Sequence, residues 1–301
     1  MELANRVQIH QSVDAGHGSL LATRFSRSKT IPNLNLKILG KPVTIDLDQD
    51  YYGSGFWEKV NNSLWEPDTL SFIRDNCGHN TVFLDIGAAN GAITLAAAIC
   101  GAETHSFEPD PIIYGVLKRN VEINTEYSRL IHLNHSAISI QQDEIEFAMG
   151  SNPEILSDIL FRHQDFKITK TKVVSLSKEL GKLAKVDSEL IIKMDIEGAE
   201  FIILNDESTL IELSKYKSKL LVAIHPGFKR VYEKSRIHKK ISEKRWRLKN
   251  ITESKKLFRN ISKYATVYRT NLNPVNNDDI FARLVDAGYH EFILDFDSLK
   301  R

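Results

Sequence analysis

Ionisable side chains follow two apolar runs in the second half of this 301-residue chain. The stretch IIKMDIEGAEFIIL carries Asp195 and Glu197 directly after one run, and the run LLVAI leads into His225. Because the carboxyl ends of parallel strands meet at one edge of a sheet, we expect these side chains to lie close together. Asp195 and His225 would act as a general base and its orienting partner or, together with Glu197, as ligands of a divalent metal ion.

The identity of the base depends on proton affinity. An aspartate, with an ordinary pKa near ~3.9, removes a proton from an alcohol poorly unless burial raises its pKa or a metal ion acidifies the alcohol. His225 is better suited, because the ordinary pKa of histidine is about 6.5. Glu200 lies where a helix is expected to begin, and a helix N-terminus favours an anion by about 0.3 to 1 kcal/mol. We therefore interpret Glu200 as a helix cap.

A glycine turn follows an earlier apolar run, in TVFLDIGAANGAITLAAA. Asp85 ends the run, and Gly87 and Gly91 frame a short turn in which glycine lets the backbone approach a ligand. This Gly-x-x-x-Gly spacing differs from the Gly-x-Gly-x-x-Gly pattern of dinucleotide sites and favours a ligand without a pyrophosphate. The next expected strand ends in HSFEPDP, where the Glu108 carboxylate can accept two hydrogen bonds from the hydroxyls of a ribose.

Apolar runs and helical patterns alternate between residues 68 and 224. Near-continuous apolar strands that alternate with helices indicate a mostly parallel sheet covered on both faces, a doubly wound α/β fold. Before this region, LNLKILGKPVTIDL alternates apolar and polar residues and predicts a hairpin over residues 34–47. We expect strands at 81–86, 103–107, 130–137, 190–194, 220–224, 265–268 and 291–296, and helices at 68–75, 91–100, 111–124, 176–183 and 199–205.

The composition is that of an ordinary globular chain, with 42% hydrophobic residues, 26% charged residues and a net charge of +1. Cys77 and Cys100 are too few for a disulfide framework, and the sequence has neither the apolar core of a signal peptide nor a run long enough to span a membrane. We expect a soluble, cytoplasmic protein. A basic segment over residues 229–263 is predicted to be a helical insertion, or else a lid over a substrate or surface.

Four short motifs resemble those of the FkbM-type S-adenosylmethionine-dependent methyltransferases: WEP at 65–67, DIGAANG at 85–91, FEPDP at 107–111 and MDIEGAE at 194–200. The resemblance covers about residues 65–225. It implies a class I methyltransferase fold, a Rossmann-like sheet of seven mostly parallel strands with a final antiparallel strand. The chain then divides into a polar N-terminal arm (1–30), a β cap (31–64) and a methyltransferase domain (65–301).

The resemblance also implies a site for S-adenosylmethionine and a reaction. Glu66 would contact the amino-acid portion of the cofactor, and Asp85, Gly87, Asn90 and Gly91 its methionine and sugar. Glu108 would bind the ribose hydroxyls, with Pro109 and Asp110 beside the ribose. Ser136 and Ala137 would line the adenine. The asparagine of the turn, Asn90, stands one position later than in the commonest form of the family. The implied reaction is O-methylation of a hydroxyl on a sugar, glycan or small metabolite, and a divalent metal such as Mg²⁺ is possible but not required.

Two other functions remain open from the residues. Glu108 would equally hold the ribose of NAD in an oxidoreductase or a regulator, although the glycine spacing disfavours a pyrophosphate. The basic segment, which contains Trp246, would suit a nucleic-acid methyltransferase, but the sequence lacks the Asn/Asp-Pro-Pro-Tyr type of acceptor motif. A small-molecule or glycan acceptor is therefore the expected partner.

Overall fold

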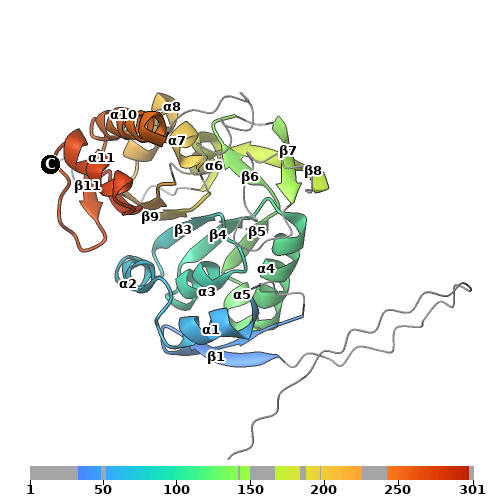
Figure 1. Ribbon diagram of the computed structural model, residues 1–301. Coiled ribbons are helices and arrows are strands. Elements are labelled where there is room, and N and C mark those ends of the chain that lie inside the picture. The colour runs from blue at the N-terminus through green and yellow to red at the C-terminus, as the bar shows by residue number, and fades with distance from the viewer. Residues whose placement is uncertain are drawn as a thin grey trace, which may run out of the picture. The chain divides into compact units, whose positions relative to one another are not determined.

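A seven-stranded sheet lies at the centre of the protein (Figure 1). The computed structural model describes residues 33–48, 52–141, 143–149, 167–183, 188–196, 198–225 and 243–297. The strands run in the order β11 (Thr266–Arg269), β12 (Glu291–Asp295), β10 (Ser218–Ala223), β9 (Glu189–Met194), β3 (Thr81–Ile86), β4 (Glu103–Phe107) and β5 (Ile131–Asn134). Neighbours pair in parallel except β12, which is antiparallel to β10 and β11. The predicted doubly wound, mostly parallel sheet is confirmed.

Helices cover both faces of this sheet, and each face has its own hydrophobic core. One face carries α6 (Leu176–Leu183), α7 (Glu200–Ile203), α8 (Glu207–Ser214), α10 (Glu243–Ile261) and α11 (Asp278–Asp286). The other carries α1 (Gly53–Asn61), α2 (Pro67–Asn76), α3 (Ala92–Ile99), α4 (Pro111–Ile123) and α5 (Thr125–Ser128). Burial on both faces explains why the central strand β3, TVFLDI, is buried at every position.

The predicted hairpin is confirmed as β1 (Leu34–Ile38) and β2 (Lys41–Ile45), which pair antiparallel. The side chain of Asn124 fastens it to the end of α4, because its Oδ1 accepts the backbone N–H of Thr44 at 2.8 Å. Helix α1 follows the hairpin and was missed in the sequence, since Gly53 and Gly55 in its first turn are poor helix formers. The predicted arm, residues 1–30, lies outside the described residues.

The strand predicted over residues 130–137 is wrong in its second half. Strand β5 ends at Asn134, and the chain turns there, with the N–H of Ser136 donating to the carbonyl of Asn134 at 3.0 Å. The next strand, β6 (Ala137–Ser139), belongs to a separate three-stranded sheet with β8 (Lys167–Ser175) and β7 (Asp143–Met149). The polar residues Asn134, His135 and Ser136 mark this turn, and the prediction ran the strand through them.

The described part of the basic segment is helix α10. One side of this helix is buried, since Trp246 is 2% exposed and Leu257 and Ile261 are fully buried, whereas Leu248 is 57% exposed. Arg247 pairs with Asp286 of α11 at 2.6 Å. Over these residues the predicted insertion is a packed helix of the fold, and residues 229–242 lie outside the described part. None of the described helices has the length and apolar character to cross a membrane.

Candidate functional site

The turn between β3 and α3 requires glycine at two positions. Gly87 has φ +86°, and a Cβ added there would lie 2.0 Å from the carbonyl oxygen of Asp195. Gly91, the N-cap residue of α3, has φ +92°, and a Cβ there would lie 2.8 Å from Leu117 Cδ1. Any residue with a Cβ would be strained at these positive φ values, and its Cβ would clash with the atoms nearby. The turn therefore joins the ends of β3 and β9 closely.

Glu108 lies buried at the end of β4, with 2% of its surface exposed. One carboxylate oxygen accepts the backbone N–H of Ala89 at 3.0 Å, and the other accepts that of Asp110 at 2.9 Å. Burial raises the pKa of Glu108 to about 8, although both backbone donors favour the charged form. The carboxylate thus links the glycine turn to the start of α4, where the Asp110 side chain caps the helix by accepting the N–H groups of Ile112 and Ile113.

Asp85 lies beneath this turn and is fully buried. Its Oδ2 accepts the hydroxyl of Thr94 at 2.6 Å, and that hydroxyl lies 2.8 Å from Ser106 Oγ. Burial raises the pKa of Asp85 to about 6, against the opposing influence of the Lys193 ammonium and the Thr94 hydrogen bond. Asp85 therefore supports the turn from below.

A hollow of about 180 Å³, called here the β3 pocket, opens above the turn. Five residues predicted to contact a cofactor or to act in catalysis line it: Glu66, Gly87, Asn90, Glu108 and Asp195. The aromatic rings of Tyr52, Phe56 and Trp65 form part of its wall, and Phe56 and Trp65 meet edge to face with centroids 5.0 Å apart. The pocket thus combines an apolar wall with a floor of acids and turn backbone, as small-molecule sites do.

A smaller hollow lies next to the β3 pocket. Gly87 and Glu108 line both, and Pro109, Ser136 and Ala137 line only the smaller one. The carbonyl of Pro109 accepts the hydroxyl of Thr171 from β8 at 2.9 Å, which ties the second sheet to this wall. Ser136 and Ala137 therefore reach the predicted site from the turn after β5 and the start of β6, although not from a strand end as expected.

Buried polar atoms without a hydrogen-bond partner gather around these hollows. In the described part of the chain there are eight such side-chain atoms, and five belong to predicted site residues: Glu66 Oε2, Asp85 Oδ1, Asn90 Nδ2, Asp110 Oδ2 and Asp195 Oδ1. Buried polar groups are normally hydrogen-bonded, so a cluster of exceptions indicates missing partners. Three of the five belong to residues that line the β3 pocket, Glu66, Asn90 and Asp195, and two of these three atoms are carboxylate oxygens, which suits a ligand with hydrogen-bond donors.

Glu66 is held in an uncommon backbone conformation. Its φ of 40° and ψ of 56° are left-handed, and it precedes Pro67, the first residue of α2. A non-glycine residue in this region is strained, and such strain persists where the surrounding structure fixes it, often at ligand sites. The neighbouring Trp65 and the Glu66 side chain both line the β3 pocket, so the strained turn brings the WEP motif to the site.

Lys193 is a site residue that the sequence analysis did not single out. It is 6% exposed, and its Nζ lies 3.2 Å from Asp195 Oδ2. Burial opposes its charge, but the carboxylates of Asp195, Glu66 and Asp85 outweigh burial and raise the pKa of Lys193. Lys193 is therefore the cation that balances the acids at the centre of the site. The available signal was a lone lysine inside the apolar strand ELIIKM.

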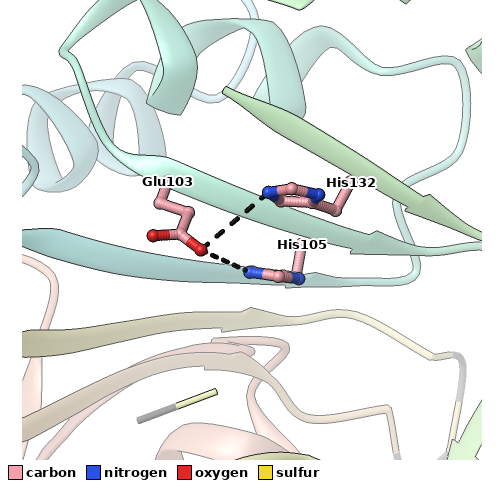
Figure 2. Close-up of side chains that lie close together, drawn as sticks. All are labelled: Glu103, His105 and His132. Atoms are coloured by element: carbon pink, nitrogen blue, oxygen red, sulfur yellow. Dashed lines mark hydrogen bonds and ion pairs between the residues drawn. The ribbon is translucent and has the colours of Figure 1, made fainter. Parts of the chain in front are cut away.

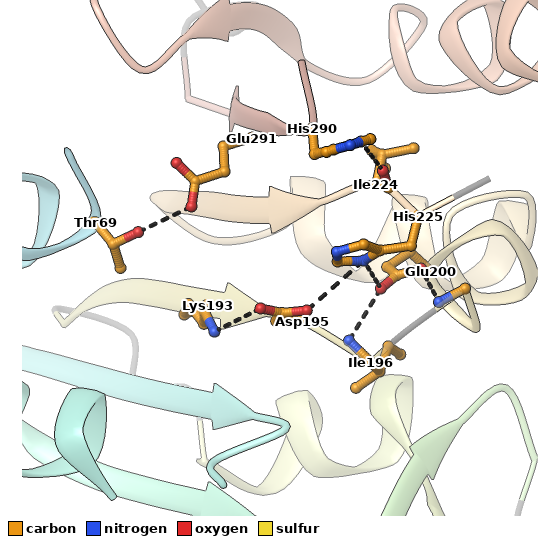
Figure 3. A network of polar contacts seen from close by, with 10 residues as sticks. Thr69, Lys193, Asp195, Ile196, Glu200, Ile224, His225, His290 and Glu291 are labelled. Atoms are coloured by element: carbon orange, nitrogen blue, oxygen red, sulfur yellow. Dashed lines mark hydrogen bonds and ion pairs between the residues drawn. The ribbon is translucent and has the colours of Figure 1, made fainter. Parts of the chain in front are cut away.

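Asp195 and His225 come together at the ends of β9 and β10, as predicted (Figure 3). His225 Nδ1 lies 3.7 Å from Asp195 Oδ1 and 3.3 Å from Glu200 Oε1. Burial opposes ionisation of Asp195, but Lys193 and His225 outweigh it, so the pKa of Asp195 lies below its usual range. Glu197, the third predicted catalytic residue, lies outside the described residues.

Glu200 is fully buried beside His225. Its carboxylate accepts the backbone N–H of Ile196 at 2.9 Å and that of Gly198 at 2.7 Å. Glu200 is not the helix cap that was expected, because these N–H groups precede α7 and its N-cap residue makes no side-chain hydrogen bond. Its contact with the His225 ring was not expected, and it makes Glu200, Asp195 and His225 a set of three possible metal ligands with atoms within 4.8 Å of one another.

A second, larger hollow of about 370 Å³, called here the acidic hollow, lies on the other side of Asp195. Glu66 and Asp195 line both it and the β3 pocket. The acidic hollow is also lined by Asp68, Ala223, His225, Thr270, Gly288, Tyr289, His290 and Glu291. The two hollows therefore meet at a pair of carboxylates.

His290 and Glu291 also belong to the site and were not identified in the sequence. The Nδ1 of His290 lies 2.9 Å from the carbonyl of Ile224, and its ring stacks on that of His225 with centroids 5.6 Å apart (Figure 3). Burial lowers the pKa of His290 and raises that of Glu291, whose Oε1 accepts the hydroxyl of Thr69 at 3.2 Å. Both residues precede or begin the last predicted strand, and no local motif marks them.

The chain matches the FkbM methyltransferase domain over residues 85–289, which is more than half of its length. With its sheet order and glycine turn, it belongs to this family of S-adenosylmethionine-dependent methyltransferases. The resemblance inferred from the four motifs is thereby confirmed. No protein with a curated description matches the sequence.

Solved methyltransferase structures resemble the fold distantly. The methyltransferase FkbM from Methylobacillus flagellatus KT is 13% identical with a TM-score of 0.40, and the similarity spans 73% of this chain and 44% of that chain. Geranyl diphosphate C-methyltransferase from Streptomyces coelicolor A3(2), solved with Mg²⁺, a thiolodiphosphate and S-adenosyl-L-homocysteine, is 9% identical with a TM-score of 0.38 over 82% and 81%. Precorrin-6y C5,15-methyltransferase from Geobacter metallireducens GS-15 is 14% identical with a TM-score of 0.31 over 66% and 69%.

Proposed function

We propose that this chain is an S-adenosylmethionine-dependent O-methyltransferase that methylates a hydroxyl on a sugar, a glycan or a small metabolite. The observation that supports it best is the pair of adjoining hollows that share Glu66 and Asp195. Methyl transfer needs two ligands side by side with their reacting atoms aligned. The β3 pocket would take the cofactor and the acidic hollow the acceptor.

The residues of the β3 pocket suit the cofactor. Glu66 and Asn90 offer buried atoms without partners to an amino-acid group, and Glu108 stands at the ribose position at the end of β4. Glycine at position 87 lets the end of β9 approach the turn, which brings Asp195 to the pocket. Ser136 and Ala137 would lie against the adenine in the smaller hollow. When bound, the cofactor supplies an electrophilic methyl group on a sulfonium, and the protein aligns the acceptor with it.

We assign removal of the acceptor's proton to His225. Its Nδ1 faces Glu200 and Asp195, and a proton held on Nδ1 leaves Nε2 as the nitrogen that accepts a proton. Asp195 is the weaker base, because its pKa is lowered and Lys193 holds it as an anion. Asp195 would orient the imidazole and stabilise its positive charge after proton transfer.

A divalent metal ion is an alternative aid to the same chemistry. Asp195, Glu200 and His225 would hold it, and it would acidify the acceptor hydroxyl. A set of one imidazole and two carboxylates suits a transition metal better than Mg²⁺, which prefers oxygen ligands and water. The prediction from sequence named Glu197 as the third ligand beside Asp195 and His225, in the place that Glu200 takes in this set.

The lining of the acidic hollow supports a polar acceptor. Asp68, Glu66 and Glu291 bring carboxylates, and Thr270 and Tyr289 bring hydroxyl groups. Carboxylates accept hydrogen bonds from vicinal hydroxyls and repel anions, so a neutral sugar or polyol fits better than a phosphate or nucleic acid. Cytoplasmic location stays part of the proposal and is supported by two free cysteines.

Calorimetric titration with S-adenosylhomocysteine, with NAD as the competing ligand, tests the cofactor. We expect binding of S-adenosylhomocysteine and none of NAD, and stabilisation by NAD alone would refute the proposal. Transfer of a labelled methyl group to a panel of neutral sugars, phosphorylated sugars and oligonucleotides then tests the acceptor. Methylation of nucleic acid alone would contradict the sugar or metabolite assignment while leaving the cofactor assignment intact.

A further inference from the structure

Two histidines and a glutamate meet near the amino ends of β4 and β5 (Figure 2). His105 and His132 are register partners on these parallel strands, and their rings stack with centroids 4.5 Å apart and planes 17° apart. Glu103 stands two residues before His105, so strand alternation places both on the same face. Because Glu108 follows the other end of β4, roughly 10 Å of strand separates His105, the nearest member of this cluster on β4, from the β3 pocket.

The possible ligand atoms of the three side chains lie close together. Glu103 Oε1 lies 3.4 Å from His105 Nε2 and 3.9 Å from His132 Nε2, and the ligand atoms all lie within 4.8 Å of one another. Both contacts are longer than the usual hydrogen bond of about 2.7 to 3.2 Å. A tetrahedral Zn²⁺ ion with bonds of about 2.0 to 2.1 Å holds its ligand atoms about 3.3 Å apart. Because the imidazole lone pairs lie in the ring planes, the two stacked rings would turn toward each other to bring all three atoms to binding distance.

We propose that Glu103, His105 and His132 form a binding site for a divalent transition metal, with Zn²⁺ as the best match. Imidazole nitrogens favour Zn²⁺ over Mg²⁺ or Ca²⁺, and the carboxylate offsets part of its charge. The ion can enter from solvent, since the side chains of His132 and Glu103 are 53% and 36% exposed. Three protein ligands leave the fourth position to water.

The position of the cluster assigns the metal a structural role. Strand β5 is the edge strand of the seven-stranded sheet, and β4 is its neighbour. An ion held by His132 from β5 and by Glu103 and His105 from β4 would cross-link the edge strand to the sheet. A ligand that binds only the folded chain at about 100 times its Kd raises the ratio of folded to unfolded protein about 100-fold. Metal binding would therefore stabilise this edge without contacting the β3 pocket.

Calorimetric titration of the full chain with Zn²⁺, in the absence of cofactor, tests the site. Removing a residue that only hydrogen-bonds to a metal ligand lowers metal affinity by about 10- to 100-fold. His132→Ala removes a ligand itself, so it should lower the affinity for Zn²⁺ by about 100-fold or more. Glu103→Gln, which preserves side-chain shape, should also weaken binding. A rise in the melting temperature with Zn²⁺ should occur in the wild type and vanish in His132→Ala.

The matched control is His225→Ala, which removes one imidazole from the other set of possible ligands, Asp195, Glu200 and His225. Zinc binding that survives in His225→Ala and is lost in His132→Ala supports the proposal. If both sets bind metal, each variant should lose one bound Zn²⁺ ion per chain, and this result also supports it. Wild-type protein that binds no Zn²⁺ would overturn it. Unchanged affinity in His132→Ala would do so too, provided that the metal-free variant melts like the wild type.

Discussion

The β3 pocket is lined largely by residues that follow β3 and β4 directly in sequence, whereas the acidic hollow collects side chains from widely separated segments. In the first, a glycine turn and the Glu108 carboxylate hold each other through hydrogen bonds across a few residues. In the second, His225 and Glu291 lie near each other only because β10 and β12 are neighbours in the sheet. One half of the site is a local structure, and the other is a product of strand order.

This difference matches the two tasks that we propose for the halves. A cofactor common to a family can be held by a short backbone turn and two acids, and short motifs in the sequence carry that turn. An acceptor that differs among family members is held better by side chains from separate elements, because each can change without altering the turn. Gly87 and Asp195 connect the halves, since the Asp195 carbonyl packs against the Cα of Gly87.

The largest effect is expected for Gly87→Ala, which acts where the halves touch. An added Cβ would lie 2.0 Å from the Asp195 carbonyl oxygen at φ +86°, so the turn and the end of β9 must move apart. We expect loss of S-adenosylhomocysteine binding and destabilisation by at least about 2 kcal/mol. Gly181→Ala in α6 is the control, because a Cβ there meets nothing within 4 Å, and helix propensity predicts a gain of about 0.5 to 1 kcal/mol. Equal melting temperatures for the two variants would contradict the prediction.

Asp195→Asn should lower turnover without lowering cofactor affinity, and so distinguish the two halves of the site. The substitution keeps the shape but removes the charge that faces His225 and Lys193, so turnover should fall by about 10²-fold or more while cofactor affinity stays within a few-fold. Steady-state kinetics and calorimetry measure the two quantities. Near-normal turnover would assign Asp195 a structural role.

Chelation distinguishes the two roles left open for Asp195. If a chelator abolishes wild-type activity and a divalent metal restores it, Asp195 is a metal ligand. If chelation has no effect and His225→Ala is as harmful as Asp195→Asn, the two residues work as base and orienting partner.

Glu108→Gln should produce the converse result, with the cofactor affected more than the chemistry. A hydrogen bond to a charged group contributes about 1.5 to 3 kcal/mol, so above the Glu108 pKa of about 8 loss of the carboxylate charge should weaken S-adenosylhomocysteine binding by roughly 10- to 100-fold. Turnover at saturating cofactor should change less than in Asp195→Asn. Glu103→Gln at the other end of β4 is the control and should bind the cofactor normally. Unchanged affinity in Glu108→Gln would mean that the ribose lies elsewhere.

The smallest expected effect is on the pH dependence of stability without ligand. Burial raises the pKa of Glu108 to about 8 and that of Asp85 to about 6, so both bind protons more tightly in the folded chain than in the unfolded one. Below their ordinary pKa values, both groups make their full contribution to the free energy of unfolding. That contribution is lost as pH rises through about 6 for Asp85 and about 8 for Glu108. The fall in melting temperature between about pH 6 and pH 9 should be smaller in Glu108→Gln than in the wild type. An identical fall would show that Glu108 does not titrate in this range.

The sheet and the cofactor half were predictable because their signals are short-range. Apolar runs bounded by turns predicted the strands of the seven-stranded sheet, and the motif DIGAANG predicted the turn in which Gly87 and Gly91 have positive φ. The prediction failed at residues 135–137, where a polar turn ends β5 and the chain enters another sheet. Periodicity reports which positions are buried, but not which sheet buries them.

The sequence by itself determined the strands of the central sheet and which acids stand at their ends, because turn geometry and side-chain alternation depend on neighbours a few residues away. Only the tertiary structure decided that Lys193 balances Asp85 and Asp195, that Glu200 reaches His225, and that His132 lies beside His105. These contacts join segments whose proximity follows from the order of strands in the sheet. The pKa of each buried acid also depends on the charges that the fold places around it, so the chemistry of the site was fixed only when the strands were assembled.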